Sequence, residues 1–72
     1  MDYIAKIRNL RKTNGLSQKE MADLLQTTQQ QYSKYENLLQ ELPIRHLVTI
    51  CKKFCISADW LLGLNEEAPQ KE

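Results

Sequence analysis

A row of amide, hydroxyl and amine side chains between residues 29 and 37 offers the most concentrated hydrogen-bonding chemistry in the sequence. A helix turns by about 100° per residue, which places these groups on one side: Gln29, Gln30, Ser33, Lys34 and Asn37. The opposite side then holds Thr28, Tyr32, Tyr35 and Glu36. By itself, this amide-rich and nearly acid-free face indicates only an exposed polar surface.

Catalysis and metal binding are not indicated. The sequence contains no nucleophile beside a base, no carboxylate pair and no set of metal ligands at a useful spacing. A chain of 72 residues also buries only about three-fifths of its unfolded surface, which leaves little room for an enclosed active site. We therefore expect no enzyme, no cofactor, no metal and no small-molecule substrate.

Two helix starts position the polar row. Ser17 is followed three residues later by Glu20, which predicts a capping box, and Thr28 is followed by Gln31 at the same spacing. The turn between these helices is left with three residues: Leu25, Gln26 and Thr27. Helices joined so closely must cross steeply.

The crossing needs a small residue in the first of these helices and an apolar wedge between the two. Ala22 lies in the middle of the first helix and allows the second to approach. The wedge is predicted to consist of Met21, Leu25, Tyr32 and Tyr35. The polar row would then face away from the rest of the domain.

Three further helices are predicted around this pair. The first, from Tyr3 to about Lys12, ends at the Asn14-Gly15 turn signal. A solvated face is the favoured role of its Lys6, Arg8 and Lys12, with phosphate contacts as the alternative. The last begins at the cap Ser57 and ends at Gly63. Its apolar side chains exceed what one short helix buries, so some of them, with Leu64, are expected to face a second subunit: Trp60, Leu61 and Leu62.

The fourth helix begins at Pro43 and carries an apolar stripe that should complete the core: Ile44, Leu47, Val48, Cys51 and Phe54. His46 points away from this stripe, and a role at the surface or next to a bound phosphate group is favoured over metal ligation. Core packing is the favoured role of Cys51 and Cys55, with redox or metal chemistry as alternatives. Residues 65–72 are charged, contain Pro69, and are expected to be disordered.

The charge is only +1 overall and is weakly polarised. Residues 1–36 hold six basic and four acidic side chains, whereas residues 37–72 hold four and five. Any non-specific affinity for DNA should therefore be modest. Because the chain has neither an apolar run of about 20 residues nor a basic and apolar start, we expect a cytoplasmic protein.

Several motifs in order resemble the lambdoid phage repressor and Cro family, also called the Xre family. The matching positions are Arg11, GLSQ from Gly15, Glu20, Ala22, TTQQ from Thr27, YEN from Tyr35 and SADWLLG from Ser57. The resemblance covers most of the chain. It implies an all-α, compact five-helix domain of the lambda-repressor-like DNA-binding type over residues 1–64. It also implies sequence-specific DNA binding by a bacterial or phage-encoded regulator, with repression as the favoured role.

The resemblance also assigns roles to individual residues. Base reading in the major groove falls to Gln29, Gln30, Ser33 and Lys34, because a Gln amide can bond bidentately to adenine. Phosphate positioning falls to Gln18, Lys19, Thr28 and Asn37. Arg11 is expected to pair with Glu36 inside the fold. A homodimer through Trp60, Leu61, Leu62 and Leu64 would recognise a near-palindromic operator.

The sequence departs from this family at Leu38, where a glycine is usual; Gln26 and Cys55 also occupy turn positions. Either the third helix continues through Leu38 or this residue adopts a strained turn. Leu38 and Leu39 are expected to pack over the core, with a contact patch as the alternative. That patch and the low net charge leave open a rival function, a protein-interaction module such as an antitoxin or partner-binding regulator.

Overall fold

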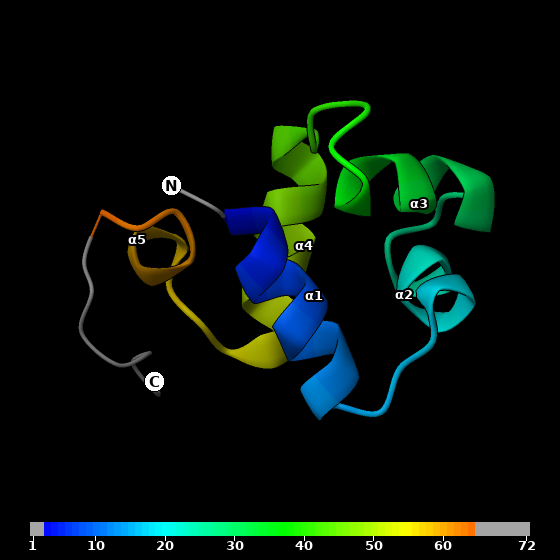
Figure 1. Ribbon diagram of the computed structural model, residues 1–72. Coiled ribbons are helices and arrows are strands. Elements are labelled where there is room, and N and C mark those ends of the chain that lie inside the picture. The colour runs from blue at the N-terminus through cyan, green and yellow to red at the C-terminus, as the bar shows by residue number, and fades with distance from the viewer. Residues whose placement is uncertain (1–2, 65–72) are drawn as a thin grey trace.

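A computed structural model describes residues 3–64, which form five helices without a β-strand (Figure 1). Their bounds are α1 (Tyr3–Thr13), α2 (Gln18–Leu24), α3 (Gln29–Glu36), α4 (Ile44–Phe54) and α5 (Ala58–Leu61). The all-α prediction is confirmed. The expected tail, residues 65–72, lies outside the described residues. None of the helices within residues 3–64 is long and apolar enough to cross a bilayer.

The two central helices begin at the predicted caps. The Ser17 hydroxyl accepts a hydrogen bond from the Glu20 backbone N–H at 3.0 Å, and the Glu20 carboxylate accepts one from the Ser17 N–H at 2.8 Å. The Thr28 hydroxyl accepts a bond from the Gln31 N–H at 3.1 Å. Each cap satisfies backbone donors that the first helical turn leaves unpaired. Both predicted caps and the capping box at Ser17 are confirmed, whereas at Thr28 the Gln31 side chain does not return to the cap and the box is not completed.

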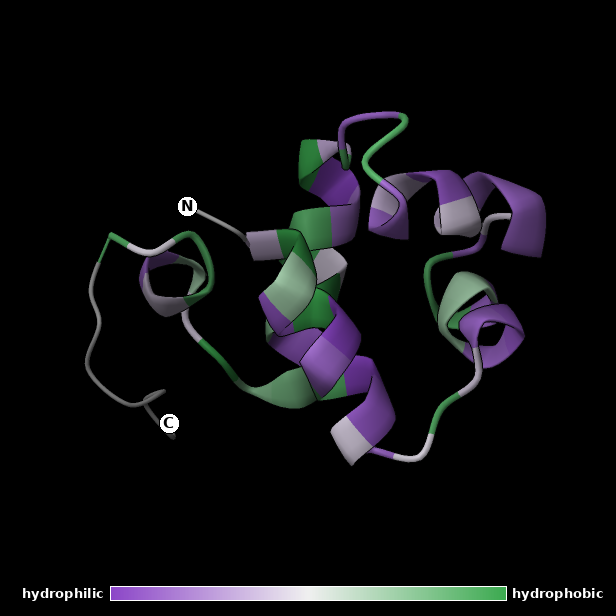
Figure 2. Ribbon diagram, viewed as in Figure 1, coloured by the Kyte–Doolittle hydropathy of each residue, from purple (hydrophilic) through white to green (hydrophobic). Residues whose placement is uncertain are grey.

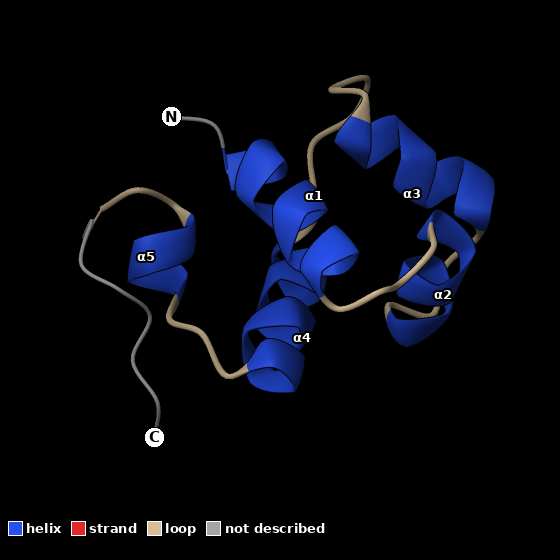
Figure 3. Cartoon of the chain, turned by 60° about the horizontal axis from the view of Figure 1, so that its bottom comes forward, coloured by secondary structure: helices blue, strands red, loops and turns tan. Residues whose placement is uncertain are grey.

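The predicted wedge is the centre of the core. Met21, Ala22 and Tyr32 have no exposed surface, and Leu25 and Tyr35 are each 4% exposed. The two tyrosine rings meet edge to face, with centroids 6.3 Å apart. Other helices add the remaining core residues: Ile4, Ile7, Leu47, Ile50 and Leu61. Two views place α2 and α3 on one side of α1 and α5 on the other (Figures 1 and 3).

The orientation of α4 differs from the prediction. Leu47 and Ile50 are buried, but Ile44 is 71% exposed and Val48 is 44% exposed. Phe54 is half-buried. The buried face of the helix is therefore rotated away from the predicted stripe. The neighbouring helices pack against the side that carries Ile50 and leave Ile44 and Val48 in solvent. Apolar spacing alone cannot distinguish these two adjacent faces.

The cysteines and the basic residues of α1 also depart from expectation. Cys51 is half-buried and Cys55 is exposed, so core packing is wrong for Cys55; both are free thiols. Lys6 is half-buried. Its Nζ lies 2.7 Å from the Trp60 carbonyl oxygen and 4.9 Å from the centre of the Trp60 ring. Arg8 contacts Glu36 at the end of α3. Of the three basic residues expected to be solvated, only Lys12 is exposed.

Each of the five helices is followed within two residues by a residue in the left-handed conformation. These residues are Gly15, Gln26, Leu38, Cys55 and Gly63. At the end of α3, Leu38 has φ 62°, its N–H donates to the Tyr35 carbonyl at 3.2 Å, and the Leu39 N–H donates to the Lys34 carbonyl at 2.8 Å. Of the two alternatives for Leu38, the strained turn is therefore the one found. The turn directs both leucines outward, so packing over the core is wrong: each is 71% exposed.

Leu38→Gly is expected to raise the free energy of unfolding by about 0.5–1 kcal/mol, because relief of left-handed strain exceeds the added flexibility of glycine. Chemical denaturation measures the change. Leu39→Gly is the matched control, since it removes an equally exposed leucine from a residue without positive φ. It should destabilise the fold slightly. Equal effects of the two substitutions would contradict this account.

Candidate nucleic-acid interface

The polar row lies on the outer side of α3. Gln29, Gln30 and Lys34 are exposed. Within residues 3–64, their side chains make no hydrogen bond or ion pair. Figure 2 shows this helix as mostly hydrophilic. The fold therefore leaves three long polar side chains available to a partner.

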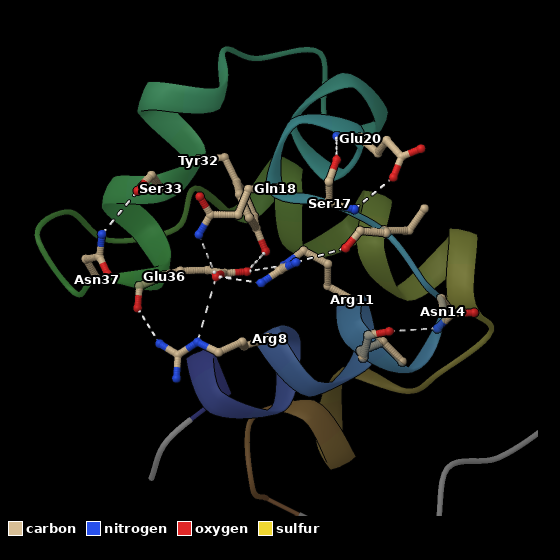
Figure 4. Close-up of polar contacts among 12 residues, drawn as sticks. Arg8, Arg11, Asn14, Ser17, Gln18, Glu20, Tyr32, Ser33, Glu36 and Asn37 are labelled. Carbon is tan, nitrogen blue, oxygen red and sulfur yellow. Dashed lines mark hydrogen bonds and ion pairs between the residues drawn. The ribbon is translucent and has the colours of Figure 1, made fainter.

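Ser33 and Asn37 extend this face by one turn, but they are bonded to each other. The Asn37 Nδ2 donates to the Ser33 Oγ at 3.1 Å (Figure 4). Ser33 is half-buried and Asn37 is exposed. Their polar groups are thus held in a fixed arrangement beside Gln30 and Lys34.

Gln31, the third glutamine of the run, has a different role that the sequence pattern did not reveal. Its Nε2 donates to the Tyr35 hydroxyl at 3.3 Å and to the Gln40 side-chain oxygen. It therefore ties α3 to the following loop and does not join the outer face. Its spacing from the cap Thr28 favoured a capping box, but the bond found is to Tyr35, one helical turn further along.

Two helix starts carry residues predicted to contact phosphates, and the start of α2 lies beside Glu36 at the end of α3. Gln18 and Lys19 are the first two residues of α2, and Thr28 caps α3. Lys19 is exposed and lies 3.4 Å from Asp23, one turn away. Two helix N-termini with unpaired backbone N–H groups are suited to bind anions, as phosphate recognition requires.

A buried carboxylate, Glu36, joins the helices behind this face (Figure 4). The Arg11 Nε donates to Glu36 Oε2 at 2.7 Å, and its Nη2 donates to Oε1 at 3.3 Å. The Tyr32 hydroxyl donates to Oε2 at 2.5 Å. Arg11 also donates to the Leu16 carbonyl at 2.8 Å. Arg11 and Glu36, paired in the sequence analysis, are thus in direct contact between α1 and α3.

Two residues that the sequence analysis did not connect with Glu36 also bind it. The Gln18 Nε2 donates to Oε1 at 3.0 Å. The Arg8 Nη2 donates to the Glu36 backbone carbonyl at 2.7 Å, and the Arg8 Nε lies 3.7 Å from Oε1. Gln18 therefore has one amide hydrogen engaged inside the protein. The second hydrogen and the backbone N–H remain suited to a phosphate.

The charges of this cluster are mutually stabilised. Burial alone would raise the pKa of Glu36, but hydrogen bonds from Arg11, Tyr32 and Gln18 outweigh it and lower this pKa. The bond to Glu36 raises the pKa of Arg11. Because the folded pKa of Glu36 is below its unfolded value, the stabilisation is present above the unfolded pKa. It is lost as the pH falls through the folded pKa.

His46 is not at the surface position predicted for it. It is 4% exposed, and its ring centre lies 5.8 Å from that of Tyr35. Its Nε2 is buried without a hydrogen-bond partner. Burial, and then the charge of Arg45, lower the pKa of His46. The prediction failed because the buried face of α4 is rotated toward this residue.

One of the four residues suggested for a dimer contact is not at the surface. Leu61 has no exposed area and belongs to the core, so its assignment to a contact surface is wrong. Trp60 and Leu62 are half-buried, and Leu64 is 69% exposed. The helix begins at the predicted cap, where the Ser57 hydroxyl accepts a bond from the Trp60 N–H at 3.0 Å, and Leu61 packs into the core cluster.

Comparison with known proteins yields matches over most of the chain. Residues 4–67 match a protein family described as a helix-turn-helix domain. The chain is 28% identical over 69 residues to a protein named an uncharacterized HTH-type transcriptional regulator of Bacillus subtilis, covering 96% of this chain and 62% of that protein. It is 33% identical over 63 residues to similarly named proteins of Rickettsia conorii and Rickettsia prowazekii.

The two rickettsial matches cover 88% of this chain and 50% and 48% of those proteins. The chain thus spans about half to three-fifths of the length of these curated relatives. No solved structure is significantly similar to it.

Arg11→Ala and Glu36→Ala are each expected to lower the free energy of unfolding by about 3–5 kcal/mol, since each leaves a buried charge without its partner. The double variant should lose less than the sum, because the two residues form one pair. Urea denaturation of all four proteins completes the cycle, and Lys12→Ala is the control for an exposed cation of α1. Strictly additive losses would contradict the coupling.

Proposed function

Because the chain belongs to a helix-turn-helix domain family of the Xre type, we propose that it binds double-stranded DNA sequence-specifically and represses transcription. The observation that carries this proposal is the outer face of α3, where Gln29, Gln30 and Lys34 are exposed and unpaired within the described domain. Its relatives named as HTH-type transcriptional regulators support the same role.

In this proposal, α3 enters the major groove with its N-terminal end leading. Gln29 and Gln30 lie in its first turn, and each amide can accept from N6 and donate to N7 of one adenine. Ser33 and Lys34 lie one turn further and reach neighbouring base edges; Lys34 suits guanine. These residues would determine which sequence is bound.

Phosphate contacts position the domain. Gln18 and Lys19 would contact one phosphate at the start of α2, with the helix dipole contributing. Thr28 and Asn37 would contact the backbone at the two ends of α3. The bond from Gln18 to Glu36 supports this role, because it fixes the amide before DNA arrives.

Two copies are required for a selective site. One helix reads only a few base pairs, and a domain of this size provides too small an interface for genomic specificity. A two-fold dimer through Trp60, Leu62 and Leu64 would set two α3 helices about 34–36 Å apart, one turn of a near-palindromic operator. Leu64 is its main free contact, being 69% exposed.

A protein-interaction role on the same fold is the second candidate, and one observation favours it. The described surface carries four strongly exposed aliphatic residues apart from Leu64: Leu38, Leu39, Ile44 and Val48. Such apolar exposure suits a protein partner. Salt separates the candidates, since DNA binding weakens steeply as ionic strength rises whereas an apolar contact need not.

Gln29→Ala should weaken binding to a duplex selected from a random pool by about 1–3 kcal/mol and leave binding to random DNA nearly unchanged. Lys19→Gln, at an exposed site outside the base-reading face, should weaken both duplexes alike. Fluorescence titration at fixed salt measures the affinities of the wild-type protein and both variants for the two duplexes. Equal losses on the two duplexes for both variants would contradict the separate roles.

Leu64→Glu should reduce cooperative binding of two copies to the selected duplex, because it places a charge in the proposed contact. Sedimentation with and without duplex measures the stoichiometry. Asn9→Glu, which changes the net charge by the same amount at an exposed residue of α1, is the control. Binding of a single copy to an asymmetric site, unchanged by Leu64→Glu, would contradict the dimer.

A further inference from the structure

A cavity of about 320 Å³ lies between the end of α2 and one side of α4. Its walls include Leu24 and Gln26 from the end of α2 and its turn, and Arg45, Thr49 and Lys53 from α4. None of the lining residues carries a carboxylate. Its volume is at the lower end of the range typical of small-ligand sites.

The two cations of this cavity can converge on one group. Arg45, Thr49 and Lys53 are spaced four residues apart, so they follow one another along one side of α4. Arg45 and Lys53 are separated by about 12 Å along the helix axis at 1.5 Å per residue, a span that two long side chains can close over Thr49. Within residues 3–64, neither cation is paired with a carboxylate.

A second observation concerns the wall of the cavity. His46, which also lines it, has a buried Nε2 without a hydrogen-bond partner among the described residues. Buried polar atoms of native proteins nearly always have partners. The Thr49 hydroxyl already donates to the Arg45 carbonyl at 3.0 Å, so it offers only lone pairs to a ligand. The hydrogen-bond donors that the cavity offers to a ligand are therefore mainly the cationic groups of Arg45 and Lys53. Leu24 makes part of the lining apolar.

We propose that this cavity binds a phosphate group, held by Arg45 and Lys53 and placed against His46 and Leu24. A guanidinium and an ammonium are the side chains best suited to this anion. The phosphate belongs either to a small phosphorylated molecule or to a DNA backbone, since both present the same chemistry. The site lies outside the base-reading face and touches the α2–α3 turn through Gln26.

Another reading assigns the two cations to the C-terminal end of the α2 dipole, because the last turn of α2 contains no basic residue. In that case, removing either charge would lower stability and leave phosphate binding unaffected. Binding and thermal stability are therefore both measured for each variant.

The test uses nuclear magnetic resonance of the whole chain with inorganic phosphate and glycerol 3-phosphate, against sodium chloride of equal ionic strength. We expect saturable shifts of the Gln26 and Thr49 amides and the His46 ring. Binding should weaken roughly tenfold or more in Arg45→Gln and Lys53→Gln, since each loses a charge-assisted bond. Lys52→Gln is the matched control, because Lys52 is exposed on α4 outside the cavity.

Duplex titrations over a range of salt distinguish the two sources of phosphate. If the phosphate belongs to DNA, Arg45→Gln and Lys53→Gln each reduce the slope of log affinity against log salt by about one, and Lys52→Gln does not. If it belongs to a small molecule, the slope is unchanged while probe binding is lost. Equal behaviour of Lys52→Gln and Lys53→Gln, or loss of stability alone, would overturn the proposal.

Discussion

The ionic cluster around Glu36 is the interaction on which the arrangement of the helices depends. One buried carboxylate accepts bonds from Arg11 on α1, Gln18 on α2 and Tyr32 on α3. A buried charge is costly unless its partners are fixed, so the correct contacts among these helices are favoured over alternative packings that would leave Glu36 unpaired. The cluster thereby sets the outer face of α3 relative to the start of α2.

This coupling links stability to the proposed function. Gln18 lies at the start of α2, where a phosphate is expected, and it is also bonded to Glu36. Its amide is therefore held in place by the same carboxylate that joins α1 to α3. In the proposed DNA complex, an amide held in this way would lose little conformational freedom on binding, which would favour affinity without additional contacts. Under the proposed function, a change at Glu36 would therefore affect both the stability of the fold and the placement of Gln18.

The chain tolerates unfavourable backbone and surface features away from this cluster. Gln26, Leu38 and Cys55 adopt left-handed conformations that favour glycine, and Leu38, Leu39 and Ile44 are each 71% exposed. Proteins commonly retain such costs where a surface has another use. The exposed leucines support a partner-binding role as the second candidate, and the basic cavity beside Gln26 supports a separate anion site. Both surfaces lie outside the polar row of α3.

The sequence by itself determined the features that depend on residues close together in the chain. The caps at Ser17 and Thr28 follow from hydrogen bonds between residues three positions apart, and the amide row of α3 follows from the helical period. The contact of Arg11 with Glu36 was anticipated because a family resemblance supplied it; spacing alone would not have done so. These features are specified by local geometry or by a shared motif.

Only the tertiary structure decided which faces are buried. The buried face of α4 includes Ile50 and His46 while Ile44 is left in solvent, Leu61 enters the core, and Gln18 turns to Glu36. The cavity between α2 and α4 likewise combines residues about 20 to 30 positions apart. Several adjacent faces of each helix are apolar enough to pack, and the choice among them depends on the shape and charge of neighbouring helices, which no local pattern encodes.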